Sequence, residues 1–233
     1  MLIAGFQKMT LLDYPDKIAA LIFTQGCNFA CGYCHNPEMI PSVRILPYQP
    51  ELEPNAILNF LSRRRGLLDG VVISGGEPTL HADLGDFMES IKSMGFLVKL
   101  DTNGSNPEIL ERLLEKNLLD YIAMDVKHNV KDYQSLVKND CVPDIQKSIE
   151  IIKDSGIDYE FRSTLVPGTH ESKDISAMGE MIRGAKQWYL QNFRPLKTLT
   201  RNMQLLKPFT PKELKKFQEI ANKYAKLVQV RNG

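Results

Sequence analysis

The sequence predicts an α/β protein with a parallel sheet, because apolar runs of strand length alternate with amphipathic stretches of helix length from Ala19 onward. The expected strands are 19–25, 70–74, 96–102, 121–126, 158–166 and 187–193, with a short closing run at 227–230. Six βα units are too few for an eightfold barrel, and no insertion is long enough to hide two more. We therefore expect a partial (β/α)6 TIM-like barrel that is open on one side.

We expect one domain over residues 1–233, with a lead-in at 1–18, the barrel core at 19–195, and a C-terminal helix and short strand at 196–233. The lead-in is expected to form a hairpin around Tyr14-Pro15-Asp16. Two helix starts are readable: Asn106-Pro107 offers an N-cap and an N1 proline, and Thr210-Pro211-Lys212-Glu213 has capping-box spacing. Residues 41–54 form a proline-bearing connection.

Composition excludes several classes of partner. The 29 Lys and Arg against 28 Asp and Glu give a net charge of +1, so no bulk field favours nucleic acid or a membrane. The start of the chain lacks the features of a secretory signal, and nowhere do 18 apolar residues run together. We expect a cytoplasmic protein whose cysteines are reduced.

Three cysteines, Cys27, Cys31 and Cys34, fall within eight residues directly after the first core strand. Three thiolates on a short loop can converge on one soft metal centre and leave one ligand position open, as in a four-iron cluster with one thiolate missing. The alternatives are a zinc site completed by His35, which the adjacency of residues 34 and 35 disfavours, and free thiols. The remote Cys141 is interpreted as a non-ligand.

Polar residues follow the other strands at their carboxyl ends, where parallel α/β folds bind ligands. Gly75-Gly76-Glu77-Pro78 combines close backbone approach with a carboxylate that can pair with an amine, although a plain βα turn is the alternative. Asp101, with Thr102, ends a buried strand and needs a cation or donors nearby, whereas Asn103-Gly104 is also a common turn pair. Asp125 and Lys127 point to the same side of an extended chain, so a simple ion pair is the alternative there.

Two residues of the fifth unit keep two interpretations each. Arg162 interrupts an apolar strand, so it is either a clamp for a carboxylate or a barrel-interior residue paired with a neighbouring acid. His170 follows the turn Val166-Pro167-Gly168. A solvent-exposed loop histidine is the favoured interpretation, and a functional role at this strand end is the alternative.

The spacing of Cys27, Cys31 and Cys34, with Tyr33 before the last cysteine and Gly75-Gly76-Glu77-Pro78 after the next strand, resembles the radical S-adenosylmethionine (SAM) superfamily. The stretches 13–15, 23–29, 33–37, 101–104, 124–127 and 189–193 narrow the resemblance to the anaerobic ribonucleoside-triphosphate reductase activating proteins, in their longer form. The likeness covers essentially the whole chain.

This resemblance implies a [4Fe-4S] cluster on the three cysteines, SAM at the fourth iron, and a 5′-deoxyadenosyl radical that abstracts hydrogen from a glycine of a partner enzyme. Tyr33 would place its backbone by the adenine, and Gly75, Gly76 and Glu77 would meet the methionine amine. Lys127 would approach the methionine carboxylate. The remaining positions implied around SAM are Asp101, Thr102, the Ala123 carbonyl and Asp125, then Arg162 and Gln191, with a monovalent cation possible near Asp101 and Asp125.

Three functions remain to be separated. The first is a glycyl-radical activase for anaerobic ribonucleotide reductase, or for an enzyme of the pyruvate formate-lyase type, with flavodoxin or ferredoxin as external electron donor, because only one cysteine cluster is present. The second is a radical SAM enzyme acting on a small molecule such as a 7-deazaguanine precursor. The third is a non-catalytic zinc module.

Overall fold

The computed structural model describes residues 1–40 and 52–231, and most of the 41–54 connection lies outside them. The chain divides into two compact units. The first unit comprises Met1–Asn28, Glu38–Thr102 and Asn106–Ile122, and the second comprises Phe29–Pro37, Asn103–Ser105 and Ala123–Gly233. Each unit is described by itself.

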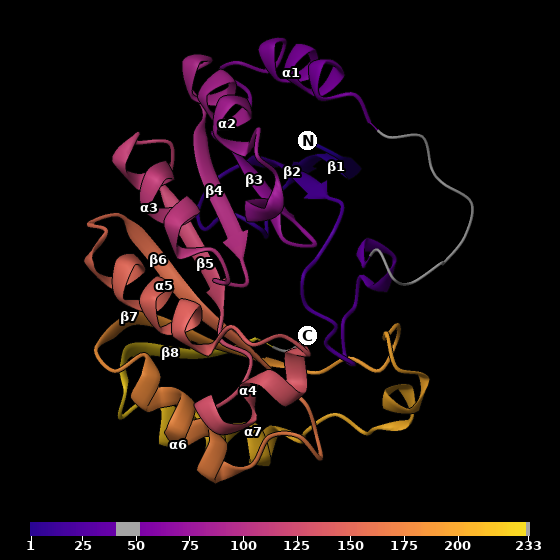
Figure 1. Cartoon of the computed structure of the whole chain (residues 1–233), viewed down its shortest axis with the longest axis vertical. Coiled ribbons are helices and arrows are strands. Elements are labelled where there is room, and N and C mark those ends of the chain that lie inside the picture. The colour runs from indigo at the N-terminus through magenta and orange to yellow at the C-terminus, as the bar shows by residue number, and fades with distance from the viewer. Residues whose placement is uncertain (41–51, 232–233) are drawn as a thin grey trace. The chain divides into compact units, whose positions relative to one another are not determined.

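The strands of the first unit pair in chain order (Figure 1). β1 is antiparallel to β2, and β2, β3 and β4 are parallel, with Ala19 opposite Gly70 and Gly70 opposite Leu97. The turn between β1 and β2 passes through Tyr14, whose carbonyl accepts a 3.3 Å hydrogen bond from Lys17 N, as the expected hairpin requires. The elements are β1 Ile3–Thr10, β2 Ala19–Thr24, α1 Pro54–Ser62, β3 Gly70–Gly75, η2 Pro78–Leu80, α2 Leu84–Ser93, β4 Leu97–Thr102 and α3 Pro107–Glu115.

The core of the first unit is built from strands that are buried on both faces. Ile22, Val72 and Ile73 are fully buried, as is Val98, so these strands read as continuous apolar runs rather than alternating ones. Helix α3 begins at Pro107 as expected, but the Asn106 side chain does not cap it. Asn106 occupies the N-cap position as predicted, but its side-chain amide donates to Thr79 and makes no capping hydrogen bond.

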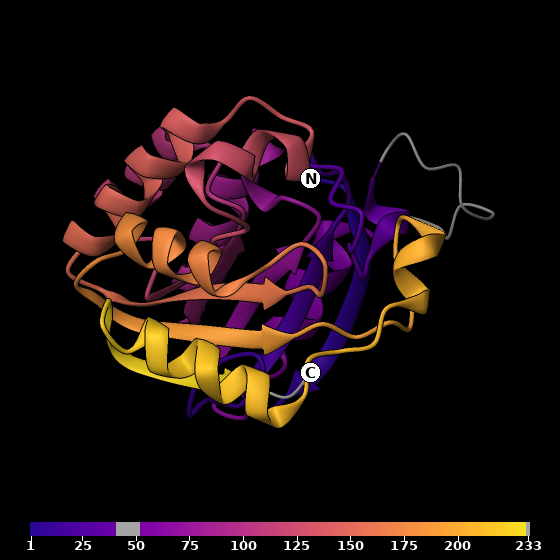
Figure 2. The same ribbon diagram turned by 90° about the horizontal axis from the view of Figure 1, so that it is seen from below.

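The second unit carries the parallel strands β6, β7 and β8, with Phe161 opposite Trp188 and Trp188 opposite Val228. Helices α6 and α7 lie side by side (Figures 1 and 2). The predicted capping box is confirmed, because Thr210 and Glu213 exchange hydrogen bonds at the start of α7. The elements are α4 Val130–Val137, α5 Val142–Asp154, β6 Asp158–Leu165, α6 Ser172–Met181, β7 Ala185–Asn192, η3 Arg201–Leu205, α7 Pro211–Ala221 and β8 Ala225–Arg231.

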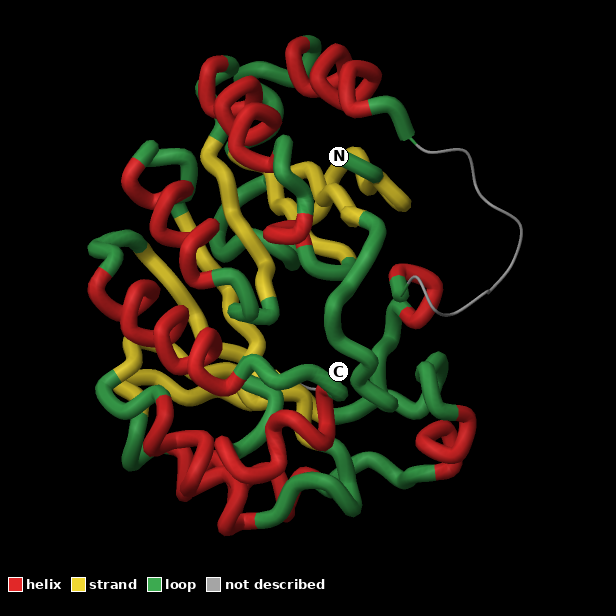
Figure 3. Tube along the Cα trace, viewed as in Figure 1, coloured by secondary structure: helices red, strands yellow, loops and turns green. Residues whose placement is uncertain are grey.

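Two short elements span the division between the units: η1 Pro37–Met39 and β5 Tyr121–Asp125. The segment between β7 and α7 is mostly loop around η3 (Figure 3). Within residues 1–40 and 52–231, none of the helices combines the length and the apolar character needed to cross a bilayer.

Candidate active site

The glycines after β3 are fitted against the backbone that leads into the cysteine loop. Gly76 N donates to Thr24 O at 2.9 Å, and Glu77 N donates to Gly26 O at 2.7 Å. A Cβ on Gly76 would lie 1.9 Å from Gly26 O, and Gly75, at φ +120°, would place one 2.3 Å from Thr24 N. Only glycine allows this approach, because the obstructing atoms are backbone. The first role of these glycines is therefore to hold the chain just before Cys27.

Glu77 is fully buried, and one of its carboxylate oxygens accepts three hydrogen bonds. Thr79 N, Thr79 Oγ1 and Thr102 Oγ1 donate to Glu77 Oε1 at 3.1, 2.6 and 2.8 Å. The three donors to one oxygen fix the orientation of the Glu77 carboxyl group. Thr102, which the sequence places among the SAM-binding residues by resemblance, is one of these donors to Glu77.

Asp101 has the cationic partner that its position at the end of a buried strand required. Lys99, 2% exposed and two residues earlier on the same face of β4, pairs with Asp101 Oδ1, and Ser74 Oγ donates to Oδ2 at 3.1 Å. The aliphatic stem of Lys99 is buried in the strand while its ammonium reaches the carboxylate. The sequence predicted the need for a partner but did not identify Lys99.

Asp125 in the second unit is flanked by two cations. Lys127 Nζ lies 2.8 Å from Oδ2, and Arg162 Nε lies 2.9 Å from Oδ1. Burial raises the pKa of Asp125, but Arg162 and Lys127 outweigh it and hold that pKa well below its usual range. Burial likewise lowers the pKa of Lys127, and Asp125 reverses this to well above the ordinary value. Both alternatives kept open from the sequence, the Asp125–Lys127 ion pair and the pairing of Arg162 with an acid, are present.

Buried side chains bind the backbone of this strand end. Tyr133 OH lies 3.3 Å from Lys127 N and 3.4 Å from Asp125 O, and Ser163 Oγ donates to Val126 O at 2.8 Å. His170 Nε2 donates to Lys127 O at 2.9 Å, while its Nδ1 accepts from Val166 N at 3.0 Å. The main chain that carries Asp125 and Lys127 is therefore held by hydrogen bonds from helix α4, strand β6 and the loop after β6.

The preferred interpretation of His170 was wrong, since the residue is 2% exposed rather than on a solvent-facing loop. Both ring nitrogens bond to backbone, and the ring stacks on His128 with centroids 4.9 Å apart. Burial lowers the pKa of His170 to about 4, so the ring is neutral at physiological pH. Nothing in the turn Val166-Pro167-Gly168 indicates that His170, two residues after it, is buried.

The cysteine loop has ligand atoms of the right chemistry for an iron–sulfur cluster: Cys27, Cys31 and Cys34 are all reduced, as is Cys141. Cys31 is buried, and burial raises the pKa of its thiol to about 11, an effect that the nearby Lys127 ammonium opposes. Cys141 is buried at the start of α5. Binding a metal would require deprotonation of Cys31, which a cationic centre favours.

The segment after β7 supports the cysteine loop from the same unit. Thr200 N donates to Gly32 O at 2.9 Å, and His35 Nε2 lies 3.0 Å from Arg194 O. The His35 ring also stacks on Phe193. Because Nε2 of His35 is engaged with a carbonyl, the structure gives no support to the zinc alternative through that atom.

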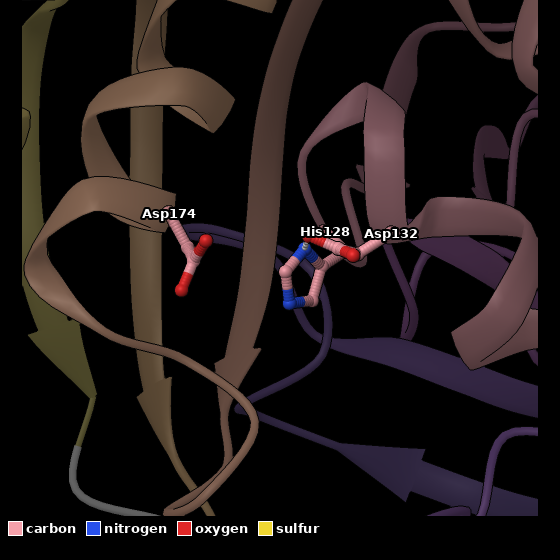
Figure 4. Close-up of side chains that lie close together, drawn as sticks. All are labelled: His128, Asp132 and Asp174. Atoms are coloured by element: carbon pink, nitrogen blue, oxygen red, sulfur yellow. Dashed lines mark ion pairs between the residues drawn. The ribbon is translucent and has the colours of Figure 1, made fainter.

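A second cluster of possible metal ligands, which the sequence did not reveal, is formed by His128, Asp132 and Asp174 (Figure 4). Asn129 N donates to His128 Nδ1 at 2.8 Å, so Nε2 carries the proton and donates to Thr169 O at 3.1 Å. The Asn129 amide also bridges the two carboxylates, at 3.0 Å from Asp132 and 2.9 Å from Asp174. His128 has no lone pair left for a metal, so these residues form a hydrogen-bond network between α4 and α6.

Thr164 and Gln191 lie opposite each other on β6 and β7, with Thr164 Oγ1 3.5 Å from Gln191 Oε1. Glu160 and Arg162 share that face of β6. Glu160 is 1% exposed and forms a bidentate pair with Arg231 of β8, at 3.1 Å for each contact. This sheet face is thus lined by polar groups that bond to one another.

Comparison with known proteins places the chain in a class. Residues 21–178 match the radical SAM superfamily, which is more than half of the chain, so the chain belongs to that superfamily. It is 33% identical over 238 residues to a protein of Methanocaldococcus jannaschii named "Putative glycyl-radical enzyme activating enzyme", covering 99% of this chain and 95% of that one. It is also 27% identical to the pyruvate formate-lyase-activating enzyme of Clostridium pasteurianum, over 84% of this chain and 82% of that enzyme. Within the superfamily the chain is a glycyl-radical enzyme activating enzyme, as the motifs predicted.

Solved structures confirm the predicted fold class. Streptococcus suis SuiB bound to S-adenosylmethionine superposes with a TM-score of 0.64 at 15% identity, over 88% of this chain and 48% of SuiB. QueE from Escherichia coli superposes with a TM-score of 0.55 at 16% identity, over 100% of this chain and 94% of QueE. The chain has the α/β partial-barrel fold of radical SAM proteins.

Proposed function

We propose that the chain installs a glycyl radical on the anaerobic ribonucleoside-triphosphate reductase, using reductive cleavage of SAM. The observation that carries the activase assignment is the end-to-end match to an activating enzyme, over 99% of this chain and 95% of the relative. The choice of partner rests on the stretches 101–104, 124–127 and 189–193, which resemble the reductase activating proteins. A partner of the pyruvate formate-lyase type is the second candidate, favoured by the Clostridium pasteurianum relative.

We propose that Cys27, Cys31 and Cys34 ligate one [4Fe-4S] cluster. Their chemistry fits, since all three are reduced thiols on one loop and a fourth protein ligand is not needed where SAM occupies the last position. When bound, the cluster supplies the electron that cleaves SAM into methionine and a 5′-deoxyadenosyl radical. The protein orients the ligand and excludes water.

The groups proposed to bind SAM divide by the part of the ligand that they recognise. Gly75, Gly76 and the oriented carboxyl group of Glu77 would receive the methionine amine, because a carboxylate can form a charge-assisted hydrogen bond with an ammonium group. Lys127 would contact the methionine carboxylate, and the backbone of Tyr33 would contact the adenine. The polar groups proposed around the methionyl and ribose parts are Asp101, Thr102, the Ala123 carbonyl, Asp125, Arg162 and Gln191.

The binding of a monovalent cation near Asp101 and Asp125 has less support in this chain than the binding of SAM. Lys99 already neutralises Asp101, and two cationic side chains flank Asp125. We propose that the electron comes from an external flavodoxin or ferredoxin, because three of the four cysteines are assigned to one cluster. We place the protein in the cytoplasm, where such donors and reduced thiols occur.

Anaerobic reconstitution followed by electron paramagnetic resonance tests the proposal. The reduced protein is mixed with SAM and, separately, with the anaerobic reductase or pyruvate formate-lyase, and each mixture is examined for a glycyl radical. A signal with the reductase supports the proposal, and a signal with pyruvate formate-lyase alone reassigns the partner. Cleavage of SAM without a radical on either enzyme would shift the assignment to a small-molecule substrate. The Cys34→Ala variant is the control that should give no signal.

A further inference from the structure

The segment between β7 and α7, residues 193–210 and from here called the basic loop, carries positive charge without acidic residues to balance it. No Asp or Glu occurs between Glu180 and Glu213, and the cationic residues of the basic loop are Arg194, Lys197, Arg201 and Lys207. The whole chain has a net charge of only +1, so this imbalance is local. A cluster of like charges on one segment produces a potential that attracts a partner of the opposite sign.

Three of these four cations are exposed and lack an acidic partner. Arg194, Arg201 and Lys207 lie at the surface, and none of them forms an ion pair with any residue of 1–40 or 52–231. The fourth has a contact of its own and is not counted here. The cations just before the basic loop are different, because Arg183 and Lys186 each pair with a carboxylate. The unpaired charge therefore belongs to the basic loop itself.

Two large apolar side chains are exposed on the same loop. Leu196 is 79% exposed and Leu205 is 83% exposed. Each lies two residues from one of the unpaired cations, Leu196 from Arg194 and Leu205 from Lys207. Protein-binding surfaces combine apolar side chains with charged groups that steer association, whereas a free anion or a nucleic-acid backbone would use the cations and not the leucines. The combination therefore indicates an acidic protein as the partner.

The basic loop is held against the cysteine loop within the second unit. Thr200 N donates to Gly32 O at 2.9 Å, and the Arg194 carbonyl lies 3.0 Å from His35 Nε2. The packing at Gly32 is tight, since a Cβ there would lie 3.0 Å from Met203 Cε. Gly32 and His35 each directly follow a cysteine of the motif. A protein bound to the basic loop would therefore lie next to two of the proposed cluster ligands.

We propose that the basic loop is the docking surface for the external electron donor, and that this donor is an acidic electron-transfer protein. One electron passes from the reduced donor to the [4Fe-4S] cluster, so the donor is oxidised, the cluster is reduced and no atom is transferred. The inference rests on the proposed function, which places the cluster on Cys27, Cys31 and Cys34, and it adds the surface at which the donor binds.

The position of the basic loop favours the donor over the enzyme that receives the radical. Electron transfer slows steeply with distance, so a donor must bind close to the cluster, and the basic loop contacts the cysteine loop directly. The enzyme that receives the radical must instead reach SAM. The groups proposed to bind SAM are carried mostly by the ends of β3, β4 and β5, which are separate from the basic loop in the sequence.

The charge-reversal variant Arg201→Glu/Lys207→Glu tests the docking surface by direct binding. The anaerobically reconstituted protein is titrated calorimetrically with flavodoxin and, separately, with ferredoxin, two acidic electron carriers. We expect the variant to bind the donor at least about tenfold more weakly than the wild type does, because like charges then face each other. Added salt should weaken binding to the wild type more than binding to the variant.

Stopped-flow measurements add the rate of electron transfer. Reduction of the cluster by the same donor should slow by a similar factor in the variant. Reduction by photoreduced deazariboflavin, which is small and carries no charge, should keep the wild-type rate, because it does not need the docking surface.

The matched control is Lys223→Glu/Lys226→Glu, which changes the net charge by the same amount. Both lysines are exposed and lie at the amino end of β8. The basic loop follows the carboxyl end of β7, and β7 and β8 are parallel, so the control lies at the opposite edge of the sheet. Its donor affinity should stay within about twofold of the wild type in about 0.1 M salt, where charges beyond about 10 Å are screened.

A milder variant, Arg201→Gln/Lys207→Gln, covers the case in which charge reversal disturbs the cysteine loop. It removes the charge and adds no repulsion, so its loss of donor affinity should be smaller than that of the reversal variant and still larger than that of the control. Loss of iron from both variants would show that these side chains support the cluster and do not bind the donor.

The remaining outcomes overturn the inference. Equal donor affinity of the wild type and the reversal variant, or an equal loss in the control, would refute the docking surface. A reversal variant that is reduced by deazariboflavin and cleaves SAM, yet leaves no radical on the partner enzyme, would assign the surface to that enzyme. Wild-type protein that binds neither donor but cleaves SAM after this reduction would refute the inference alone. Failure to cleave SAM would contradict the proposed function, and the inference with it.

Discussion

The substitution His170→Gln should reduce the loss of unfolding free energy that the protein shows as the pH falls from 6.5 to about 4. His170 is buried against His128, and Asp174 also acts on it electrostatically. Above pH 6.5 the ring is neutral in the folded and unfolded states, so it contributes no pH dependence there. Between pH 6.5 and about 4 the unfolded chain binds a proton that the folded chain does not, so the free energy of unfolding falls as the pH falls.

The size of the effect follows from the depressed pKa. A shift from 6.5 to about 4 corresponds to about 3 kcal/mol of unfolding free energy lost by the wild type over this window, at 1.36 kcal/mol per pKa unit. In His170→Gln this part of the loss disappears. The variant should be less stable at pH 7, because the bonds from Val166 N and to Lys127 O are disturbed, and the difference from the wild type should shrink toward pH 4.

Urea denaturation followed by circular dichroism at several pH values from 7.5 to 4 measures this difference. His81→Gln is the control, since burial also lowers the pKa of His81 but that ring is only half-buried, and its curve should stay closer to that of the wild type. Parallel curves for wild type and His170→Gln, with a constant gap at every pH, would refute the reasoning.

Three further substitutions test the site. Gly76→Ala should abolish iron binding while leaving the far-ultraviolet circular dichroism unchanged, because the new Cβ would lie 1.9 Å from Gly26 O; full iron content would show that the loop tolerates the displacement. Cys141→Ala should keep the iron content of the wild type, and a loss would refute its exclusion as a ligand. Thr102→Val removes one of three donors to Glu77 and should weaken SAM binding roughly fivefold to tenfold in a calorimetric titration, whereas unchanged affinity would argue against a role for that carboxylate.

The bounds of the buried strands could be predicted closely because each strand is a continuous run of apolar residues in the sequence. The expected 70–74 and 96–102 became Gly70–Gly75 and Leu97–Thr102, since continuous apolar runs bounded by glycine or polar residues leave few alternatives. The capping box at Thr210 was equally local, because both partners lie within four residues. Local patterns of this kind need no knowledge of the tertiary structure.

The partners of buried polar groups could not be predicted, because they depend on contacts distant in sequence. Asn106 has the sequence of an N-cap, but Thr79 competes for its amide. His170 reads as a loop residue until the carbonyl of Lys127 is placed beside it. The cofactor roles of the cysteines, Glu77 and Lys127 remain predictions from the motifs. The structure adds the hydrogen-bond and ion-pair partners of Glu77 and Lys127.

The hydrogen bonds from Thr200 and to Arg194 also set an order of events during synthesis. The cysteines are made early, yet the partners of Gly32 and His35 come from the last sixth or so of the 233-residue chain. On the ribosome the thiols therefore emerge long before the loop that carries them can reach its final conformation. Loading of a metal into the finished geometry must therefore wait until residues 194–200 have been synthesised and have folded against the cysteine loop.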